Sequence, residues 1–535
     1  MGWGWVAAAA VWALSAYVAA KLMEVLWWRP RRVEEHFARQ GIRGPRYRFF
    51  VGCVREMVAL MVAASANPMP RPYRSHNVLP RVLAFYHHWR KIYGSTFLIW
   101  FGPTPRLAVA DPDLIREILL SRAEHFDRYE SHPMVRQLEG EGLVSLRGDK
   151  WAHRRKVLTP AFHMENLKLL LPFVGKTVVD MADKWRDMAA ATSGEVEIDV
   201  SEWFQVVTED AITRTAFGQS YEDGKAVFKL QTQLMAFASE AFRKVFIPGY
   251  RFLPTRKNTT SWKLDKEIRK NLVTLIGRRQ EAADTEKLHG CAGKDLLGLM
   301  IKASSENGGR VSPITVNDIV EECKTFFFAG KQTTSNLLTW TTVLLAMHPE
   351  WQERARQEVL DVCGARGIPS REQLAKLKTL GMILNETLRL YPPAVATVRR
   401  AKADVELGGC LIPRDTELLI PIMAVHHDAR LWGPDATQFN PARFTDGVAR
   451  AARHPTAFIP FGLGARMCIG QNLALLEAKL TVAIILQRFE FRLSPNYLHA
   501  PTVLMLLHPQ YGAPVIFRPR ASEPSDQAAA SVITC

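Results

Sequence analysis

Cysteine is scarce in this sequence, and no two cysteines stand at the spacing of a metal-binding or redox pair. The 535 residues contain seven cysteines, an odd number, and none of them forms a C-x-x-C motif. Such a scattered set argues against a disulfide-stabilised secreted protein and against a zinc site built on cysteine pairs. We therefore expect the protein to occupy a reducing compartment.

Repeats of twenty to fifty residues and low-complexity blocks are absent from the body of the chain. Their absence argues against solenoid, propeller and fibrous architectures. Hydrophobic residues make up 47% of the sequence, which is enough to bury a large core. The chain is therefore interpreted as one large globular unit.

Acidic residues are in deficit, with 53 Asp and Glu against 69 Lys and Arg, for a formal net charge of +16. A basic chain can bind nucleic acid, but the sequence has no nucleic-acid motif and no stripe of basic and aromatic residues. We therefore expect no nucleic acid partner. Anionic membrane lipid and an acidic protein partner suit the charge better.

One long run without charge stands at the amino terminus. Trp3 to Ala20 contains 18 residues and no charged side chain, which is just long enough to span a bilayer. Trp27 and Trp28 follow where an interfacial aromatic belt would lie, and the arginines after them predict that the carboxyl-terminal side stays in the cytosol. A cleaved signal peptide is the alternative, but it would begin with positive charge and end in small residues, and this segment does neither.

These features divide the chain into four parts. We expect a transmembrane anchor at 1–28, a basic linker at 29–48, a globular domain at 49–520 and a disordered tail at 521–535. The tail is small and polar, which disfavours a packed structure.

Helical patterns dominate the globular part, and strand-like segments are short. Phe97–Phe101 and Arg106–Ala110 are joined by a Gly-Pro pair and predict a hairpin. A capping box at Thr315–Asp318 predicts the start of a long helix that ends near Met347. The predicted fold class is mostly α with small antiparallel β-sheets (α+β).

The most informative motif surrounds Cys468. Residues Phe461 to Gly470 read F-x-x-G-x-R-x-C-x-G, a cysteine in a glycine-bracketed loop with Arg466 two residues before it. We expect Gly464 and Gly470 to let the backbone turn sharply and approach a flat macrocycle. Backbone N–H groups and the arginine would keep the sulfur as a thiolate, which suits an axial ligand of haem iron. The alternative is a buried, inert cysteine in a turn.

This motif and others between Trp151 and Gly470 resemble the cytochrome P450 family, the haem-thiolate monooxygenases. The resemblance implies the cytochrome P450 fold behind an amino-terminal transmembrane helix, and haem b as the cofactor. It also implies that Cys468 is the axial iron ligand, and that Phe461 and Arg466 of the same loop help to bind the haem.

Cations are expected beside the haem propionates, because these groups need charged partners or hydrogen-bond donors. Trp151 and Arg155 lie one turn apart on a predicted helix, and Arg399 and Arg466 match propionate-binding positions of the family. Three nearby cations are interpreted as a face for solvent or a partner protein: His153, Arg154 and Lys156.

The long predicted helix carries the run Ala329–Thr334, A-G-K-Q-T-T, which resembles the family's A-G-x-[D/E]-T-T segment. In the family the glycine lets the helix open beside the haem, and the first threonine hydroxyl helps to pass protons. Here that threonine is Thr333, which could instead bond back to its own helix. The usual acid is replaced by Gln332, which can orient water but cannot ionise. We expect proton delivery through Thr333 and ordered water, with Gln332 positioning the water.

Glu386-Thr387-Leu388-Arg389 reads E-x-x-R, which places both charges on one helix face. Such pairs are common on helices, so the motif gains meaning only from Arg443, which lies in a segment that resembles the family's P-x-R-F. The resemblance implies that Glu386, Arg389 and Arg443 form a buried ionic network that stabilises the haem-loop core. We assign this network to structure rather than to catalysis.

Three segments would line the substrate pocket by the same resemblance: residues 326–328, 392–398 and 502–507. They are mostly apolar, which suits a bulky apolar substrate, although ordinary core packing would explain them equally well. The residues predicted to contact the substrate are Phe328, Ala329, Ala394 and Val395.

A narrower resemblance is carried by Gly41–Arg48 and by Ala329–Asn336, which look like a plant group, the 72 clan, that hydroxylates hormones and terpenoids. Within it the sequence best resembles the brassinosteroid-inactivating enzymes, which hydroxylate the steroid side chain at carbon 26. Other fatty-acid, gibberellin or triterpenoid hydroxylations remain alternatives, as does a haem-thiolate isomerase or haem sensor. Gly330 and Thr333 argue against a protein that does not activate oxygen.

The source of electrons is not in this chain, because no G-x-G-x-x-G fingerprint follows a strand and no flavin-binding region is found. The resemblance implies a membrane flavoprotein reductase that uses NADPH and docks on a basic face near the thiolate. We expect the anchor to hold the protein in the endoplasmic reticulum membrane, with the catalytic domain in the cytosol.

Overall fold

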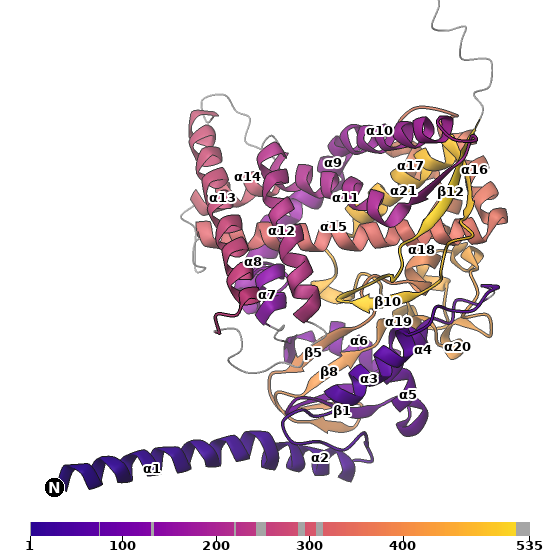
Figure 1. Ribbon diagram of the computed structural model, residues 1–535. Coiled ribbons are helices and arrows are strands. Elements are labelled where there is room, and N and C mark those ends of the chain that lie inside the picture. The colour runs from indigo at the N-terminus through magenta and orange to yellow at the C-terminus, as the bar shows by residue number, and fades with distance from the viewer. Residues whose placement is uncertain are drawn as a thin grey trace, which may run out of the picture.

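The computed structural model describes residues 2–73, 75–129, 133–218, 221–241, 253–286, 295–305 and 314–520. The tail expected at 521–535 lies outside these residues. Helices make up most of the molecule, one of them running through its middle, and the strands gather on one side (Figure 1). This arrangement is the mostly helical α+β fold expected from the sequence.

The helices are α1 (Gly2–Met23), α2 (Arg29–Arg39), α3 (Val54–Ser65), α4 (Leu79–Val82), α5 (Ala84–Tyr93), α6 (Pro112–Arg116), α7 (Pro133–Glu139), α8 (Gly148–Leu158), α9 (Met164–Leu167), α10 (Leu171–Ala190), α11 (Val200–Phe217), α12 (Tyr221–Ala241), α13 (Arg256–Glu286), α14 (Leu296–Ser305), α15 (Val316–Met347), α16 (Pro349–Cys363), α17 (Arg371–Lys376), α18 (Lys378–Leu390), α19 (Ile422–His426), α20 (Ala429–Trp432) and α21 (Gln471–Arg488). The strands are β1 (Phe97–Phe101), β2 (Thr104–Ala108), β3 (Phe126–Arg128), β4 (Val196–Asp199), β5 (Thr397–Ala401), β6 (Val405–Leu407), β7 (Cys410–Ile412), β8 (Glu417–Ile420), β9 (Phe489–Leu493), β10 (Pro501–Leu504), β11 (Leu506–Pro509) and β12 (Pro514–Pro519).

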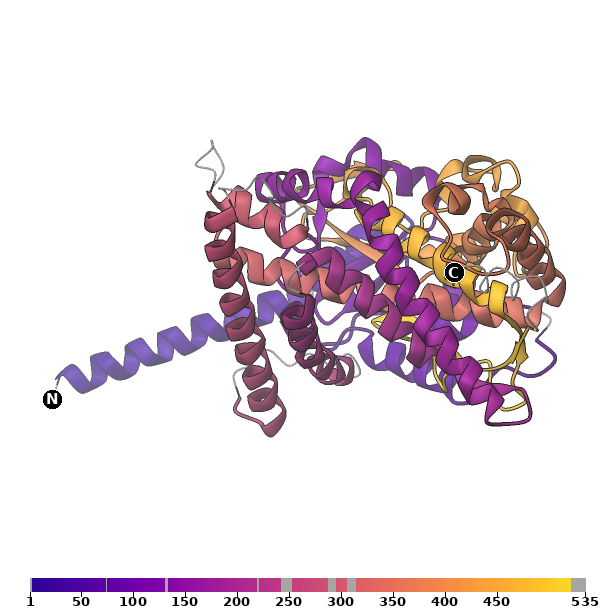
Figure 2. The same cartoon turned by 90° about the horizontal axis from the view of Figure 1, so that it is seen from above.

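The amino-terminal segment projects from the body as one helical rod made of α1, a π-helical stretch at Glu24–Trp28, and α2 (Figures 1 and 2). Residues Trp5–Arg39 are long and apolar enough to cross a membrane, and the apolar part of this segment buries none of its residues in the protein. Both observations are consistent with the predicted anchor.

The basic segment expected as a linker is helical up to residue 39 and lies against the body. Phe37 of α2 is fully buried, and the His36 Nε2 atom lies 2.8 Å from the Leu411 carbonyl oxygen on β7. The anchor is therefore joined to the globular part by a docked helix rather than by an extended chain.

The largest sheet has five strands in the order β1-β2-β8-β5-β3. β1 and β2 pair antiparallel, with Phe97 opposite Ala108, which confirms the predicted hairpin, although its second strand begins at Thr104. β2 and β8 pair in parallel, with Leu107 opposite Leu418, so the expectation of purely antiparallel sheets is wrong for this pair. Parallel strands need a long connection, and the connection between β2 and β8 spans more than half of the globular part. No local sequence pattern indicates that two strands so far apart pair with each other.

The long predicted helix is confirmed as α15, which begins at the capping box formed by Thr315 and Asp318 and ends at Met347. It crosses the molecule between other helices (Figure 1). Gly330 does not open it, because α15 is helical throughout. A Cβ atom at Gly330 would lie 2.6 Å from the Ile212 Cγ1 atom of α11, so the glycine serves the close packing of α11 on α15.

The three charged residues expected to form a network lie together, on α18 and in the segment at Pro441–Phe444. Arg389 donates from Nε to Glu386 Oε2 at 2.7 Å, and both side chains have no exposed surface. The Arg443 Nε atom lies 3.6 Å from Glu386 Oε1, while its Nη2 pairs with Asp435 at 2.5 Å. The network therefore includes a fourth charged residue, Asp435, that the motifs did not indicate.

Candidate active site

The cysteine loop turns at two glycines. Gly462 and Gly464 have φ of +77° and +74°, the left-handed region that other residues avoid. The Cys468 N–H then donates to the Phe461 carbonyl oxygen at 2.9 Å and closes the loop. Gly470 was expected to turn the chain too, but its φ is −88°, which any residue adopts.

We expect Gly464→Ala to disrupt this loop and Gly470→Ala to be tolerated. A Cβ atom at Gly464 would lie 2.2 Å from the Leu119 carbonyl oxygen, in addition to the backbone strain. At Gly470 the nearest atoms would be Phe162 Cε1 at 3.8 Å and Cys468 Sγ at 3.9 Å, which are ordinary contacts. The measurement is the haem content of the purified variants, and equal loss in both would contradict this account.

The Cys468 sulfur lies at the start of α21. Its side chain has accessible surface, yet burial raises the pKa of the thiol, against the lowering effects of the Gly470 N–H, of Arg155 and of the Gln471 N–H. The sulfur therefore has surface open to a ligand although its surroundings desolvate it. Two backbone donors and a cation are thus arranged to stabilise a thiolate once a metal binds it.

The cations expected beside the cofactor gather near this loop. The Arg466 guanidinium lies 4.5 Å from the centre of the Trp151 ring, and its Nη2 donates to the Leu146 carbonyl oxygen at 2.9 Å. Arg155 Nη1 donates to the Met467 carbonyl oxygen at 2.8 Å. Arg399 lies on β5. Among the described residues, its guanidinium group donates only to neighbours on its own strand, Thr397 Oγ1 and the Val398 carbonyl oxygen.

Arg128 on β3 is a further cation that the sequence did not indicate. It lies directly opposite Arg399 in the pairing of β3 with β5. Burial lowers the pKa of Arg399 to about 10, with further lowering by Arg128 and Arg466. The Arg128 Nε atom is buried and has no hydrogen-bond partner within the described residues. No motif surrounds Arg128, so only the strand pairing reveals it.

These residues fit a haem. A buried guanidinium nitrogen without a partner and three arginines held close together call for anionic groups between them, which two propionates supply. The Cys468 sulfur would supply a thiolate ligand to its iron. Within the described part of the chain, no group of three His, Cys, Asp or Glu side chains could hold a bare metal ion.

Arg154 does not belong to the solvent-facing cations as predicted. Its side chain is buried and pairs with Glu322 at 3.2 Å and with Asp318 at 3.4 Å, both on α15. Arg154 and Leu158 stand four residues apart on α8 and are both buried, so they share the face of the helix that is turned inward. Lys156 is exposed and His153 is half-buried, so these two remain available to a partner.

Thr333 lies in the middle of α15, and its Oγ1 donates to the Ala329 carbonyl oxygen at 2.7 Å. This is the intrahelical bond named above as the alternative to a functional role. The hydroxyl oxygen can still accept a hydrogen bond from water while it donates. Gln332, its neighbour, faces a cavity.

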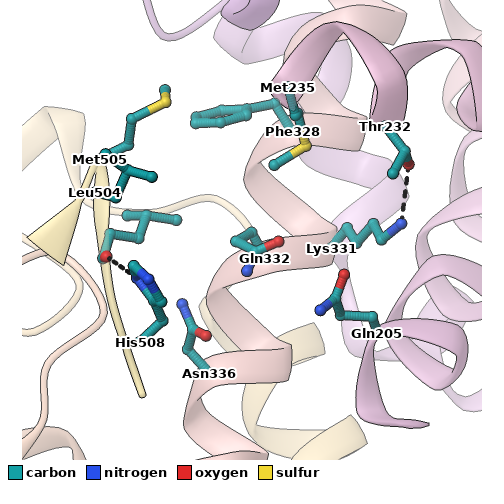
Figure 3. Close-up of a pocket in the computed structure, with 11 residues that line it drawn as sticks. Gln205, Thr232, Met235, Phe328, Lys331, Gln332, Asn336, Leu504, Met505 and His508 are labelled. Carbon is teal, nitrogen blue, oxygen red and sulfur yellow. Dashed lines mark hydrogen bonds between the residues drawn. The ribbon is translucent and has the colours of Figure 1, made fainter. Parts of the chain in front are cut away.

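This cavity has a volume of about 220 Å³ and lies between α15, α12, α11 and the β10–β11 hairpin (Figure 3). Its lining is half polar: Gln205, Thr232, Met235, Phe328, Lys331, Gln332, Asn336, Leu504, Met505, Leu506 and His508. Of the predicted substrate contacts, Phe328 lines it, whereas Ala329, Ala394 and Val395 do not. Val395 is buried, and its carbonyl oxygen accepts from the Met423 N–H.

The sequence model of the cytochrome P450 family matches residues 79–512. The chain belongs to the cytochrome P450 family. Its cysteine loop is therefore that of a haem-thiolate monooxygenase family, whose members bind haem through a cysteine thiolate.

Relatives match the chain over nearly its whole length. It is 87% identical over 528 residues to "Cytochrome P450 734A6" of Oryza sativa subsp. japonica, covering 97% of each chain. It is 66% identical over 504 residues to "Cytochrome P450 734A1" of Arabidopsis thaliana, covering 94% of each. The solved structure of a retinoic-acid-bound cyanobacterial CYP120A1 matches with a TM-score of 0.71 over 83% of this chain and 96% of that one, at 23% identity, which supports the fold.

Proposed function

We propose that this chain is a membrane-anchored cytochrome P450 that hydroxylates brassinosteroids on the side chain at carbon 26 and so inactivates the hormone. The observation that carries the substrate class is the 87% identity to a 734A relative over 97% of both chains. The runs Gly41–Arg48 and Ala329–Asn336 resemble the brassinosteroid-inactivating enzymes in particular.

Haem b, when bound, supplies the cleavage of O₂ and the transfer of one oxygen atom to a C–H bond. Cys468 would hold its iron, and Phe461 would keep the cysteine loop closed through its carbonyl oxygen. Four residues proposed from the sequence would bind the propionates, and Arg128 would join them: Trp151, Arg155, Arg399 and Arg466. The buried, unpartnered Arg128 Nε atom supports this assignment.

Thr333 and Gln332 are the proposed catalytic residues. The Thr333 hydroxyl would accept a proton from water and pass its own proton onward, since it can accept and donate at once. Gln332 would orient that water through its amide, because it lines the cavity and directly precedes Thr333 in the chain. Phe328, Ala329, Ala394 and Val395 remain the proposed substrate contacts.

A flavoprotein reductase that takes electrons from NADPH is the proposed partner, and the endoplasmic reticulum membrane is the proposed location. The exposed Lys156 and the net charge of +16 suit an acidic docking partner. The apolar helix at the amino terminus suits attachment to a membrane.

The test is the mass of the products formed by membranes that carry this protein, a plant reductase and NADPH. We expect one brassinosteroid, out of a panel with gibberellins, fatty acids and triterpenoids, to gain one oxygen atom on a side-chain fragment. Membranes with the same protein but without NADPH serve as the control.

Turnover of another panel member alone would keep the monooxygenase and reject the hormone substrate. Haem-loaded protein that oxygenates nothing would favour the alternative of an isomerase or sensor. The observation that favours this alternative is Gln332, an amide at the position where the family usually has an acid.

A further inference from the structure

Oxygenation consumes protons that this chain must deliver without an acid at position 332. In a monooxygenase, O₂, a C–H bond, two electrons and two protons give a hydroxylated product and water. The nearest upstream carboxyl on α15 that is fully buried, Glu322, lies about 15 Å away along the helix at 1.5 Å per residue. It is held by Arg154 at 3.2 Å and by the Leu143 N–H at 2.9 Å. Another route is therefore needed.

Two cavities meet beside position 332. The inner one, described above, is lined by Gln332 and has a volume of about 220 Å³. The outer one has a volume of about 580 Å³ and is lined by Glu209, Glu222, Lys225, Ala226, Lys229, Thr232, Gln233 and Lys331. Most of these α12 side chains are exposed, so the outer cavity opens to solvent. Lys331 and Thr232 line both cavities and form the wall between them.

A part-buried ion pair occupies this wall. The Lys331 Nζ atom lies 2.5 Å from Glu209 Oε2, with 5% of the lysine side chain and 23% of the glutamate side chain exposed. Nζ also donates to Thr232 Oγ1 at 3.1 Å, and Lys331 reaches toward Thr232 in Figure 3. An ammonium group has three donors, and those two partners account for two of them among the described residues. The Phe327 ring also lies against this ammonium group, with its centre 5.4 Å from Nζ. The third N–H has no hydrogen-bond acceptor among the described residues, so it is available to water in the inner cavity.

The inner cavity is suited to water. Asn336 is only 3% exposed, and its Nδ2 atom has no hydrogen-bond partner among the described residues. It lies one turn after Gln332 on α15, and both amides face the cavity (Figure 3). A buried polar donor without a partner is costly, and water that fills about 30 Å³ per molecule has room here. Water in this cavity would satisfy Asn336 and reach Gln332.

We propose that Glu209 and Lys331 deliver protons from solvent to water in the inner cavity, and so replace the acid that is absent at position 332. Solvent in the outer cavity protonates the Glu209 carboxylate. Lys331 Nζ gives one proton to inner-cavity water as it takes the proton from Glu209, so the lysine stays cationic. Water held by Asn336 and Gln332 passes a proton to the Thr333 hydroxyl oxygen. The hydroxyl gives up its own proton in exchange, toward the oxygen that is reduced to water. This inference rests on the monooxygenase activity, not on the identity of its substrate.

Other charged groups line the solvent side of the pair. Glu222, Lys225 and Lys229 of α12 border the outer cavity together with Glu209 of α11 and Lys331 of α15. Glu222 is the carboxylate among the three α12 residues, and it forms no ion pair with Lys331 in the described structure. Glu222 therefore offers a matched control: it is a carboxylate on the same cavity without contact to the wall.

The decisive variants are Glu209→Gln, Glu209→Asp and Glu222→Gln. For Glu209→Gln we expect the fraction of NADPH converted to product to fall at least about tenfold. This is less than the roughly 10²–10⁴-fold effect of a positioned acid–base group, because water still supplies some protons. We also expect a larger solvent deuterium isotope effect. Haem content and the substrate dissociation constant should stay unchanged. Glu209→Asp should recover part of the coupling, and Glu222→Gln should match the unmodified protein.

Unchanged coupling in Glu209→Gln would overturn the proposal, and so would a loss of haem or substrate affinity that explains the lower coupling. A readout that needs no turnover is a crystal structure of the haem-loaded protein. We expect ordered water on Asn336 Nδ2 and Lys331 Nζ, and a dry inner cavity would also overturn the proposal. Coupling is compared on whichever substrate is turned over, so failure of the brassinosteroid assignment leaves this test intact.

Discussion

The Cys468→Ser variant is expected to lose all oxygenated product. A serine hydroxyl has nearly the shape of the thiol but does not ionise in the range where a thiol does, so it cannot act as an anionic, electron-donating ligand. The structure around Cys468 prepares an anion, with N–H groups of Gly470 and Gln471 and the Arg155 cation all lowering the thiol pKa against the effect of burial. A serine at this position would give these donors a neutral hydroxyl in place of an anion.

The measurement combines product mass with the absorption spectrum of the reduced protein under carbon monoxide, which reports a thiolate ligand. The matched control is Cys410→Ser, since Cys410 is half-buried on β7 and burial raises its thiol pKa. We expect the control to keep both signals. A thiolate spectrum that survives in Cys468→Ser would mean that another cysteine binds the iron.

The second large effect is expected from Glu386→Ala, which should leave little folded, haem-loaded protein. The Arg389 guanidinium is fully buried and donates to both carboxylate oxygens, at 2.7 and 2.8 Å. The same carboxylate accepts from the Asn440 N–H at 2.9 Å. Removing one partner of a buried ion pair costs about 3–5 kcal/mol, which is a large part of the 5–15 kcal/mol that stabilises a typical domain.

The network also explains why the loss would reach the haem site. Arg389 Nη1 donates to the carbonyl oxygens of His426 and Ala436, at 2.9 and 2.6 Å, and Arg443 pairs with Asp435. These bonds join α18 to the irregular segment that leads into the cysteine loop. Without Glu386 the fully buried Arg389 guanidinium would lose its counter-ion, whereas Arg443 would keep Asp435.

Glu386→Ala is measured as the yield of haem-loaded protein and as the urea concentration at half-unfolding. Glu165→Ala is the matched control, because Glu165 forms an exposed pair with Lys168 at the same i,i+3 spacing. We expect no change in either quantity for the control. Equal behaviour of the two variants would show that the buried network does not stabilise the fold.

Local signals explain most of what the sequence predicted correctly. The capping box of α15 and the two strands of the hairpin depend on neighbours within a few residues. The E-x-x-R pair is also local, but its partner Arg443 lies far away in sequence, so its meaning came from family resemblance. The expected opening of the helix at Gly330 was wrong, because the packing of Ile212 from α11 uses the glycine instead.

Contacts between distant segments explain what the sequence missed. Arg128 is one of several arginines in the sequence until β3 pairs with β5 and sets it opposite Arg399. Arg154 was taken for a surface cation because charged residues surround it, yet α8 turns it toward Glu322 and Asp318 of α15. Its burial could not be read from a helix whose charges are spread over all faces.

The sequence by itself determined the family, the cysteine that would bind iron, the apolar anchor and the absence of an acid at position 332, because each of these is written in a few adjacent residues. The tertiary structure alone decided where charges meet. It joined Glu209 of α11 to Lys331 of α15 in the wall between two cavities, and it set Arg128 opposite Arg399. Ion pairs and cavities depend on how helices pack, and packing depends on contacts that no single segment contains.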